Sequence, residues 1–331
     1  MSSVFAFGVG ISQTDSSGNP LDCLFPQPHL RPSEEISAAV AHLDAGTSVL
    51  KPEDLASINA DANVVPDAIL EADQPLQVVK LTEDAPIAST PEAYLKLHLL
   101  SHRLTLPNTL NLDGIFAHLP NLAWTSKGPI AAEEIDREIL SARLRGEHLE
   151  VMSVDKFPKM VNYVMPSGVR IADASRIRLG AYLGDGTTVM HEGFVNFNAG
   201  AIGPNMVEGR ISQGVIIEEG TDLGGSASTM GTLSGGGEIT ITLGKNCLVG
   251  ANAGTGIPLG DRCTIEAGLY ITAGTVITVV DETGEEVKKV KARELAGNSD
   301  MLFIRNSQNG QVICRTNRKA IELNESLHAH N

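Results

Sequence analysis

An apolar residue recurs at every sixth position along residues 171–207, and the same spacing returns along residues 241–277. A period of six fits neither an amphipathic helix nor an alternating strand. It is typical of a hexapeptide β-helix, in which each hexad forms one short strand and a turn. We therefore predict a mainly β protein with a left-handed parallel β-helix over 151–280, three hexads closing each triangular coil. The predicted inward positions are Ile171, Ile177, Leu183, Val189, Val195, Ala201 and Val207, then Ile241, Cys247, Ala253, Leu259, Ile265, Ile271 and Ile277.

The two series do not share one register, because the step from 213 to 241 is 28 residues, which is not a multiple of six. Part of this stretch must therefore leave the coil. The glycine-rich segment "GGSASTMGTLSGGGEI" (224–239) is the best candidate. We expect an excursion loop near 213–240, and loops that project from a rigid scaffold often carry binding groups.

The chain on either side of the repeat has a different pattern, which predicts an N-terminal α/β domain over 1–150 and a short C-terminal β segment over 281–331. Residues 47–75 are rich in Asp, Ala, Asn and Pro and predict mostly loop. The predicted elements are a strand over 3–12, helices over 32–46 (N-cap Ser33), 90–103 (N-cap Thr90, then Pro91) and 131–146, and two strands in "MLFIRNSQNGQVICRT" joined by an Asn-Gly turn.

Composition narrows the classes of function. The chain has 25 basic and 40 acidic residues and a formal charge of −15, which argues against a nucleic-acid or anionic-membrane partner. The four cysteines form no CxxC pair, so we expect reduced thiols and no zinc site. No signal-peptide pattern and no apolar run of about 20 residues is present. We expect a cytoplasmic protein.

Histidine is scarce in the repeat. His191 is the only histidine between residues 150 and 327, so a three-histidine metal site of the gamma-type carbonic anhydrase kind is excluded. His98 and His102 lie four residues apart on a predicted helix without a third ligand, and we expect a helix-surface pair there.

Prisms of this kind commonly pack as trimers with clefts between neighbours, and by analogy of fold an acyl-CoA thioester would suit such a cleft. In "MVEGRISQGV" (206–215), Glu208 is then a candidate base whose pKa could be raised by shielding between subunits. From the residues alone an ion pair with Arg210, two positions away, is an equally good interpretation.

Longer motifs carry a more specific resemblance. "FPKMVNYVMPSGVRIADASRIRLGAYLGDGTTVMHEGFVNFNAG", "MVEGRIS", "MGTLSGGG", "GANAGTGIPLGD", "EAGLYITAGT", "VKAREL" and "RNS" resemble the tetrahydrodipicolinate N-succinyltransferases, above all the branch found in actinobacteria. The resemblance is dense over 157–307 and continues more thinly through "LPNLAWTSKGPI" (119–130).

The resemblance implies an enzyme that transfers succinyl from succinyl-CoA to the amine of tetrahydrodipicolinate, in its ring-opened 2-amino-6-oxopimelate form, for diaminopimelate and lysine synthesis. It implies Glu208 as the catalytic carboxylate, which acts either as a general base or through an acyl-anhydride. It also implies a homotrimer with active sites between subunits. The implied succinyl-CoA contacts are Arg210, Gly225, Ser228, Ala251, Glu266, Ala267, Gly274, Lys291, Arg305, Asn306 and Ser307.

The resemblance further implies a structural Mg²⁺ or Ca²⁺ on the threefold axis, with Glu192 of each subunit as a ligand. A second acidic position of the family is Ser175 here, which weakens this expectation. Two rival interpretations of the chain stay open. One is a hexapeptide acyltransferase that uses another acyl-CoA and acceptor, and the other is a non-catalytic trimeric scaffold.

Overall fold

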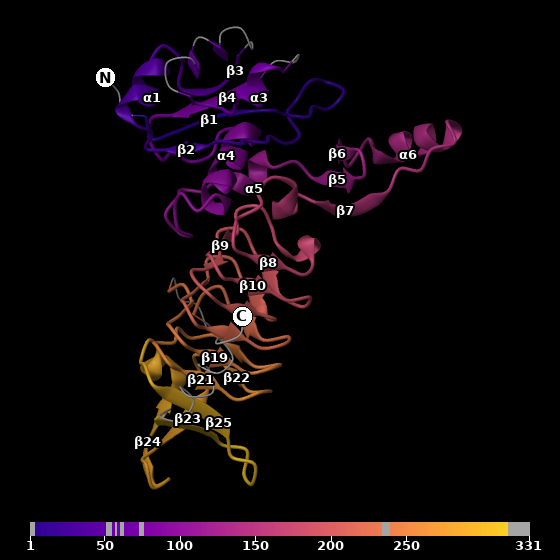
Figure 1. Cartoon of the computed structure of the whole chain (residues 1–331). Helices are drawn as coiled ribbons and strands as arrows, with labels where there is room; N and C mark the ends of the chain where they lie inside the picture. Colours follow the sequence, from indigo (N-terminus) through magenta and orange to yellow (C-terminus); the bar gives the residue numbers. More distant parts are fainter. Residues whose placement is uncertain are drawn as a thin grey trace. The chain divides into compact units, whose positions relative to one another are not determined.

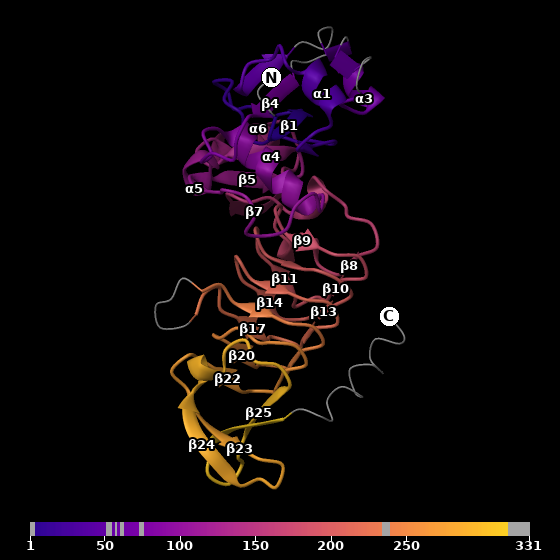
Figure 2. The ribbon, with the colours of Figure 1, turned by 90° about the vertical axis from the view of Figure 1, so that its left-hand side faces the viewer.

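The computed structural model describes residues 4–50, 55–56, 58–59, 63–72, 76–233 and 239–316. These residues form two compact units, Met1–Val164 and Met165–Asn331. The first combines helices with antiparallel strands, and the second is a stack of short parallel strands with a C-terminal hairpin region (Figures 1 and 2).

The first unit contains a four-stranded antiparallel sheet in the order β2-β1-β4-β3. The predicted strand over 3–12 is confirmed, because β1 is buried along its whole length and pairs with β4. Phe7, Val9 and Val78 of this sheet pack with Leu55 and Ile69 in one apolar core. The elements are β1 (Ala6–Gly10), β2 (His29–Leu30), α1 (Glu34–Ala39), β3 (Gly46–Leu50), α3 (Asp67–Leu70) and β4 (Leu76–Leu81).

A second, three-stranded antiparallel sheet in the order β6-β5-β7 completes the unit. Its central strand β5 is buried throughout. The helix predicted over 131–146 is confirmed as α6. The remaining elements are α4 (Thr90–Ser101), α5 (Ile115–His118), β5 (Leu122–Thr125), β6 (Gly128–Ala131), α6 (Ile135–Leu144), β7 (Val151–Asp155) and η1 (Met160–Asn162).

Two helix predictions need correction. The first predicted helix starts at Ser33 as expected, since its hydroxyl accepts from the N–H of Ile36, but it ends at Ala39 instead of near 46. Lys80 reaches across from β4 to the carbonyls of residues 41 and 43, and Gly46 already opens β3, so part of the predicted loop 47–75 is a strand. Residues 51–54, 57, 60–62 and 73–75 of that stretch lie outside the described residues.

The cap of α4 lies one residue earlier than predicted. The hydroxyl of Ser89 accepts from the N–H of Glu92, whereas the Thr90 hydroxyl donates to the carbonyl of His118 at 2.6 Å. Thr90, which the sequence favoured as the cap, thus makes a tertiary contact, and Ser89 caps the helix.

The expectation of a helix-surface histidine pair on α4 is wrong for His98, which is fully buried. The N–H of Phe25 donates to its Nε2 at 3.3 Å, and its Nδ1 lies 2.7 Å from the carbonyl of Tyr94. Burial lowers the pKa of His98 to about 3, so the ring is neutral at physiological pH and serves the core.

The second unit is a parallel β-helix whose strands stack into three faces, as Figure 2 shows for the second face. The first face contains β8 (Arg170–Ile171), β10 (Thr188–Val189), β13 (Met206–Val207), β16 (Asp222–Leu223), β19 (Leu248–Val249) and β21 (Thr264–Ile265). The second contains β11 (Phe194–Val195), β14 (Arg210–Ile211), β17 (Ser228–Thr229), β20 (Gly254–Thr255) and β22 (Tyr270–Ile271). The third contains β9 (Tyr182–Leu183), β12 (Gly200–Ala201), β15 (Ile216–Ile217) and β18 (Thr242–Leu243), and the short helix η2 (Ala174–Arg176) lies in the first coil.

The first hexad series is confirmed, since its members from Ile177 to Val207 are buried. The register then changes earlier than predicted, because the next inward strand residue is Ile211, four positions after Val207. A hexad spacing continues from Ile211 to Thr229, within the predicted excursion.

The excursion is correspondingly shorter than predicted. Residues 213–230 stay in the coil, and the chain leaves it only around 231–240, where Thr232 and Thr240 form a bridge. Residues 234–238 lie outside the described residues. The coil resumes at Leu243, so the buried Ile241 lies two positions before the strand residue that continues the ladder.

The C-terminal segment extends the first face. β25 pairs in parallel with β21 and antiparallel with β26, which confirms the predicted pair of strands around the Asn-Gly turn. β23 and β24 form an antiparallel pair with exposed lysines on β24. The elements are β23 (Val276–Val280), β24 (Glu286–Lys291), η3 (Ala292–Leu295), β25 (Met301–Arg305) and β26 (Val312–Thr316).

Candidate active site

The edge at which the chain passes from the first face to the second holds six of the thirteen predicted site residues, namely Glu192, Glu208, Gly225, Ala251, Glu266 and Ala267. We call it the carboxylate edge, and it consists of the turns 190–193, 208–209, 224–227, 250–253 and 266–269. Four of these turns have four residues, and only the turn at 208–209 has two. This shortening is also the cause of the register change after Val207.

The short turn recesses the coil at Glu208. Gly209 makes the turn feasible, because a Cβ at this position would lie 2.5 Å from the carbonyl oxygen of Ala227. Above and below, the longer turns extend further out, and a hollow of about 190 Å³ results. Its walls are Met190, His191, Glu192, Glu208 and Gly225.

Two carboxylates line this hollow close to Gly225. A Cβ at Gly225 would lie 3.6 Å from Oε2 of Glu192 and 3.7 Å from Oε2 of Glu208. Ser226 donates its hydroxyl to Glu192 Oε2 at 2.8 Å. The half-buried carboxylate of Glu208 has no hydrogen bond or ion pair within the part of the chain that the structure describes.

The Arg210 side chain is hydrogen-bonded to Ser228 and not to Glu208, the partner that the sequence suggested. Its Nη2 donates to the hydroxyl of Ser228 at 2.8 Å, on the neighbouring strand of the second face. The predicted contact residues Arg210 and Ser228 are thus brought together. No ion pair joins Arg210 to Glu208 among the described residues, which removes the structural interpretation that the sequence had left open.

The carboxylate edge continues through Ala251, Glu266 and Ala267 to the end of β25. There the backbone N–H of Arg305 donates to Glu266 Oε2 at 2.6 Å, so the segment Arg305, Asn306 and Ser307 joins the same edge. Five strand spacings separate the coil of Glu192 from β25, which corresponds to about 24 Å. The fold thus aligns residues that are far apart in the sequence along one extended line.

Gly274 and Lys291 lie away from this edge. Gly274 belongs to the turn after β22, where a Cβ would meet nothing within 4 Å. Lys291 pairs with Val276 at the start of β23, and the next residue, Ala292, donates to the carbonyl of Thr275. Gly274 and Lys291 therefore lie near each other, at the start of β23 and outside the carboxylate edge.

The residues at the expected metal position do not form a complete ligand set within one chain. Among the described residues, no group of three or more His, Cys, Asp or Glu side chains is placed to hold a metal ion. Ser175, at the second family position, donates its hydroxyl to Asp173 at 2.7 Å. A cation at Glu192 would therefore need carboxylates from further chains.

Sequence reasoning missed one residue that shapes the site. Arg176 in η2 donates to the carbonyls of Glu192 and Gly193, at 2.6 and 3.3 Å, and so holds the turn that carries His191 and Glu192. Nothing in the hexad pattern distinguishes this arginine from its neighbours, because its partners are backbone atoms of the next coil.

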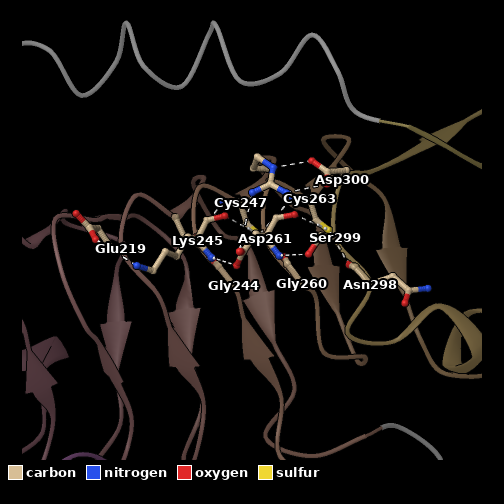
Figure 3. Close-up of polar contacts among 12 residues, drawn as sticks. Glu219, Gly244, Lys245, Cys247, Gly260, Asp261, Cys263, Asn298, Ser299 and Asp300 are labelled. Carbon is tan, nitrogen blue, oxygen red and sulfur yellow. Dashed lines mark hydrogen bonds and ion pairs between the residues drawn. The ribbon is translucent and has the colours of Figure 1, made fainter.

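A second row of charges lies on the edge from the third face to the first (Figure 3). We call it the ion-pair edge, and it consists of the turns 218–221, 244–247 and 260–263 and the segment 297–300. The Nζ of Lys245 lies 3.7 Å from Oε2 of Glu219. The guanidinium of Arg262 donates two hydrogen bonds to the carboxylate of Asp300, of 2.6 and 2.8 Å. Asp261 accepts from the N–H of Lys245. The polar groups of this edge thus find their partners within the chain.

The coil is that of a hexapeptide-repeat acyltransferase. Residues 240–273 match the family model "Hexapeptide repeat of succinyl-transferase", and residues 119–159 match the model "Tetrahydrodipicolinate N-succinyltransferase middle". The chain belongs to the tetrahydrodipicolinate N-succinyltransferase family, as its relatives show.

The 2,3,4,5-tetrahydropyridine-2,6-dicarboxylate N-succinyltransferase of Pseudomonas putida is 55% identical over 99% of both chains. The proteins of the same name from Pseudomonas aeruginosa and Vibrio cholerae are 56% and 50% identical, over 98% and 99% of both chains. A solved Campylobacter jejuni structure, described as a 2,3,4,5-tetrahydropyridine-2-carboxylate N-succinyltransferase, has a TM-score of 0.86 at 31% identity and covers 97% of this chain and 94% of its own. The β-helix is accordingly the left-handed one. No described helix is long and apolar enough to cross a membrane.

Proposed function

We propose that this chain transfers the succinyl group of succinyl-CoA to the amine of tetrahydrodipicolinate in its ring-opened form, 2-amino-6-oxopimelate. The product would enter diaminopimelate and lysine synthesis. Family membership over the whole chain supports the reaction. The observation that carries the assignment of the site is the unpartnered carboxylate of Glu208 on a shortened turn, at the wall of a hollow.

Glu208 is the proposed catalytic carboxylate. As a general base it takes a proton from the substrate ammonium, so that the free amine attacks the thioester carbonyl. The tetrahedral intermediate then collapses: the amide bond is retained, the C–S bond breaks, and the CoA sulfur takes up the second nitrogen proton, so that CoA leaves as the thiol. A carboxylate that is not bound to Arg210 is free to accept this proton. The covalent alternative is attack by Glu208 itself, which would give a mixed anhydride and release CoA before the acceptor reacts.

The carboxylate edge is the proposed path of succinyl-CoA. Its small residues Gly225, Ala251 and Ala267 leave room for an extended acyl chain against the backbone. Arg210, held by Ser228, keeps further N–H donors on an exposed side chain, which suits the free carboxylate of the succinyl group. Arg305, Asn306 and Ser307 at one end of the edge, together with Glu266, complete the proposed contacts, while Gly274 and Lys291 would bind a part of CoA that leaves the edge.

A homotrimer with the site in the groove between two prisms is part of the proposal. The edge of one subunit would then face its neighbour, and a divalent cation, Mg²⁺ or Ca²⁺, would bring together Glu192 from three chains on the axis. Three such carboxylates would repel one another without a cation. The metal content of the purified trimer and of Glu192→Gln tests this, and the proposed proton transfer does not depend on it.

The decisive experiment measures CoA release from succinyl-CoA with 2-amino-6-oxopimelate, or with 2-aminopimelate as an analogue. Glu208→Gln should lower kcat by about 10²–10⁴-fold, the range of general acid–base catalysis. Glu219→Gln on the ion-pair edge is the matched control and should retain activity. Light scattering and thermal unfolding establish that both variants keep the assembly and fold of the wild type.

Each outcome has a definite meaning. Equal rates for Glu208→Gln and wild type would remove Glu208 from the mechanism and direct attention to His191. A stoichiometric burst of CoA without acceptor would favour the anhydride over the general base. Turnover with acetyl-CoA but not succinyl-CoA would favour another acyltransferase reaction.

A further inference from the structure

The Met1–Val164 unit contains a cavity of about 240 Å³ that the proposed reaction does not use. The three-stranded sheet, the strand-like segment 11–24 and η1 line it. The walls that matter for its chemistry are Gln13, Asp22, Trp124, Thr125, Met152 and Tyr163. All of them lie within one compact unit.

Asp22 is the only ionisable carboxylate among these walls, and it is only 6% exposed. Its Oδ1 accepts from the backbone N–H of Gln13 at 2.8 Å, and its Oδ2 accepts from the hydroxyl of Tyr163 at 2.7 Å. Both donors are neutral. No basic residue lines the cavity, and Asp22 forms no ion pair among the described residues. Each carboxylate oxygen has a second lone pair, so each can accept one more hydrogen bond.

The ionised Asp22 carboxylate, buried without a positive counter-charge, costs folding free energy. Buried charges in proteins are usually paired with an opposite charge or bound to a cation. Burial raises the pKa of Asp22, and the hydrogen bonds from Tyr163 and Gln13 only partly oppose this shift. A cation that entered the cavity would remove the cost, because it would supply the missing counter-charge.

Two aromatic rings favour an organic cation over a hydrated metal ion. Trp124 is 5% exposed and fixed by a hydrogen bond from Nε1 to the carbonyl of Asp155. Tyr163 packs against Tyr94 with ring centroids 5.6 Å apart. Indole and phenol faces attract ammonium groups. The Gln13 amide packs where a side chain at Gly128 would otherwise lie, so the glycine keeps a polar group at this wall.

We infer that this cavity is a binding site for a small organic ammonium ion, with the Asp22 carboxylate as its counter-ion and Trp124 and Tyr163 as aromatic walls. The site is separate from the proposed succinyl transfer, and its test does not depend on that reaction. It gives the N-terminal unit a ligand-binding role of its own.

Trp124 is the only tryptophan of the chain, so its emission reports directly on the cavity. The full-length protein is titrated with n-butylammonium chloride. Potassium chloride and n-butanol serve as the ionic-strength control and as the uncharged analogue of similar shape. We expect a saturable change of Trp124 emission with n-butylammonium and no saturable change with either control.

Asp22→Asn keeps the shape of the side chain and removes its charge, and should weaken n-butylammonium binding at least about tenfold. Met152→Lys is a second variant, since Met152 is 43% exposed at the cavity wall and a tethered ammonium there should weaken binding without disturbing the core. Asp113→Asn, an exposed carboxylate of the same unit, is the matched control and should bind as the wild type does.

The inference is overturned if n-butylammonium gives no saturable change, or if n-butanol gives the same change. It is also overturned if folded Asp22→Asn or Met152→Lys binds as tightly as wild type. Far-UV circular dichroism establishes folding for each variant, and Met152→Lys decides the case if Asp22→Asn is unfolded.

Discussion

The two charged edges of the β-helix both consist of turns that link successive strands, and yet they differ in how their charges are paired. On the ion-pair edge, Arg262 and Asp300 bind each other, and Lys245 approaches Glu219 (Figure 3). On the carboxylate edge, and among the described residues, the Glu208 side chain has no partner and the Glu192 carboxylate accepts only from Ser226. Charge on a coil turn is therefore no sign of function by itself. A charge without a partner, next to open space, is the more informative signal.

Turn length explains the difference. On the ion-pair edge the turns at 218–221, 244–247 and 260–263 all have four residues, so side chains of successive coils come into register and pair. On the carboxylate edge the two-residue turn at 208–209 interrupts this stacking and leaves a hollow of about 190 Å³. One edge thus stabilises the coil, and the other is left open for a ligand.

After the loss of activity expected for Glu208→Gln, we expect the next largest loss from a substitution of Arg210 on the carboxylate edge. Arg210→Ala removes a charged hydrogen-bond donor, which is typically worth about 1.5–3 kcal/mol, so kcat/KM for succinyl-CoA should fall by about 10–150-fold. Steady-state kinetics with succinyl-CoA and acetyl-CoA measure it, and the loss should be confined to the succinyl donor. A loss of the same size with both donors would show that Arg210 does not bind the succinyl carboxylate.

A smaller effect is expected from filling the hollow. In Gly225→Ala the added methyl group would lie in ordinary contact with the carboxylates of Glu192 and Glu208, at 3.6 and 3.7 Å. The unfolding free energy should change by less than about 0.5 kcal/mol. Because the methyl group takes up reacting space, kcat/KM should fall by about tenfold. Unchanged kinetics in a stable Gly225→Ala protein would argue against this hollow as the reaction site.

The smallest effect is expected on the ion-pair edge. Arg262→Ala breaks the bidentate contact with Asp300, but both side chains are more than a third exposed and screened by solvent, so the loss of stability should be small. Activity should stay at the wild-type level, because no group of this edge faces the hollow. Urea unfolding and CoA release measure the two quantities side by side.

Low pH should abolish the small difference in unfolding free energy between wild type and Arg262→Ala. Hydrogen bonding to Arg262 lowers the pKa of Asp300 below its ordinary value of 3.8, so the contact contributes stability above that pH and loses it as the pH falls through the lowered pKa. The gap between wild type and Arg262→Ala should therefore narrow below about pH 4. A gap that stays constant down to complete protonation would mean that Arg262 acts through packing alone.

Much of the architecture follows from the hexad pattern. The six-residue spacing alone predicts inward positions such as Leu183 and Val195, because every strand pairs with an equivalent strand one coil away. The pattern did not locate the change of register, because a fixed step of six leads from Val207 to the polar Gln213, whereas the next inward residue lies only four positions on. The pairing of Ile211 with Val195 on the neighbouring strand defines the two-residue turn.

The first unit was less predictable for the opposite reason. His98 lies on a helix whose surroundings are set by residues more than 70 positions away, such as Phe25. Thr90, which the sequence favours as the cap of α4, donates instead to the carbonyl of His118, 28 positions away. These contacts are long-range, and a local pattern carries no information about them.

The sequence by itself therefore determined the repeat, the apolar interior of the coil and the motif around Glu208, because these depend on spacing along the chain. Only the tertiary structure decided which charges find partners. It placed Glu208 in the turn between two faces and Arg210 on the second face, brought Ser228 to Arg210, and carried Arg305 back to Glu266 through the C-terminal strands. Such choices depend on turn lengths and on neighbouring coils, which fix distances that sequence spacing leaves open.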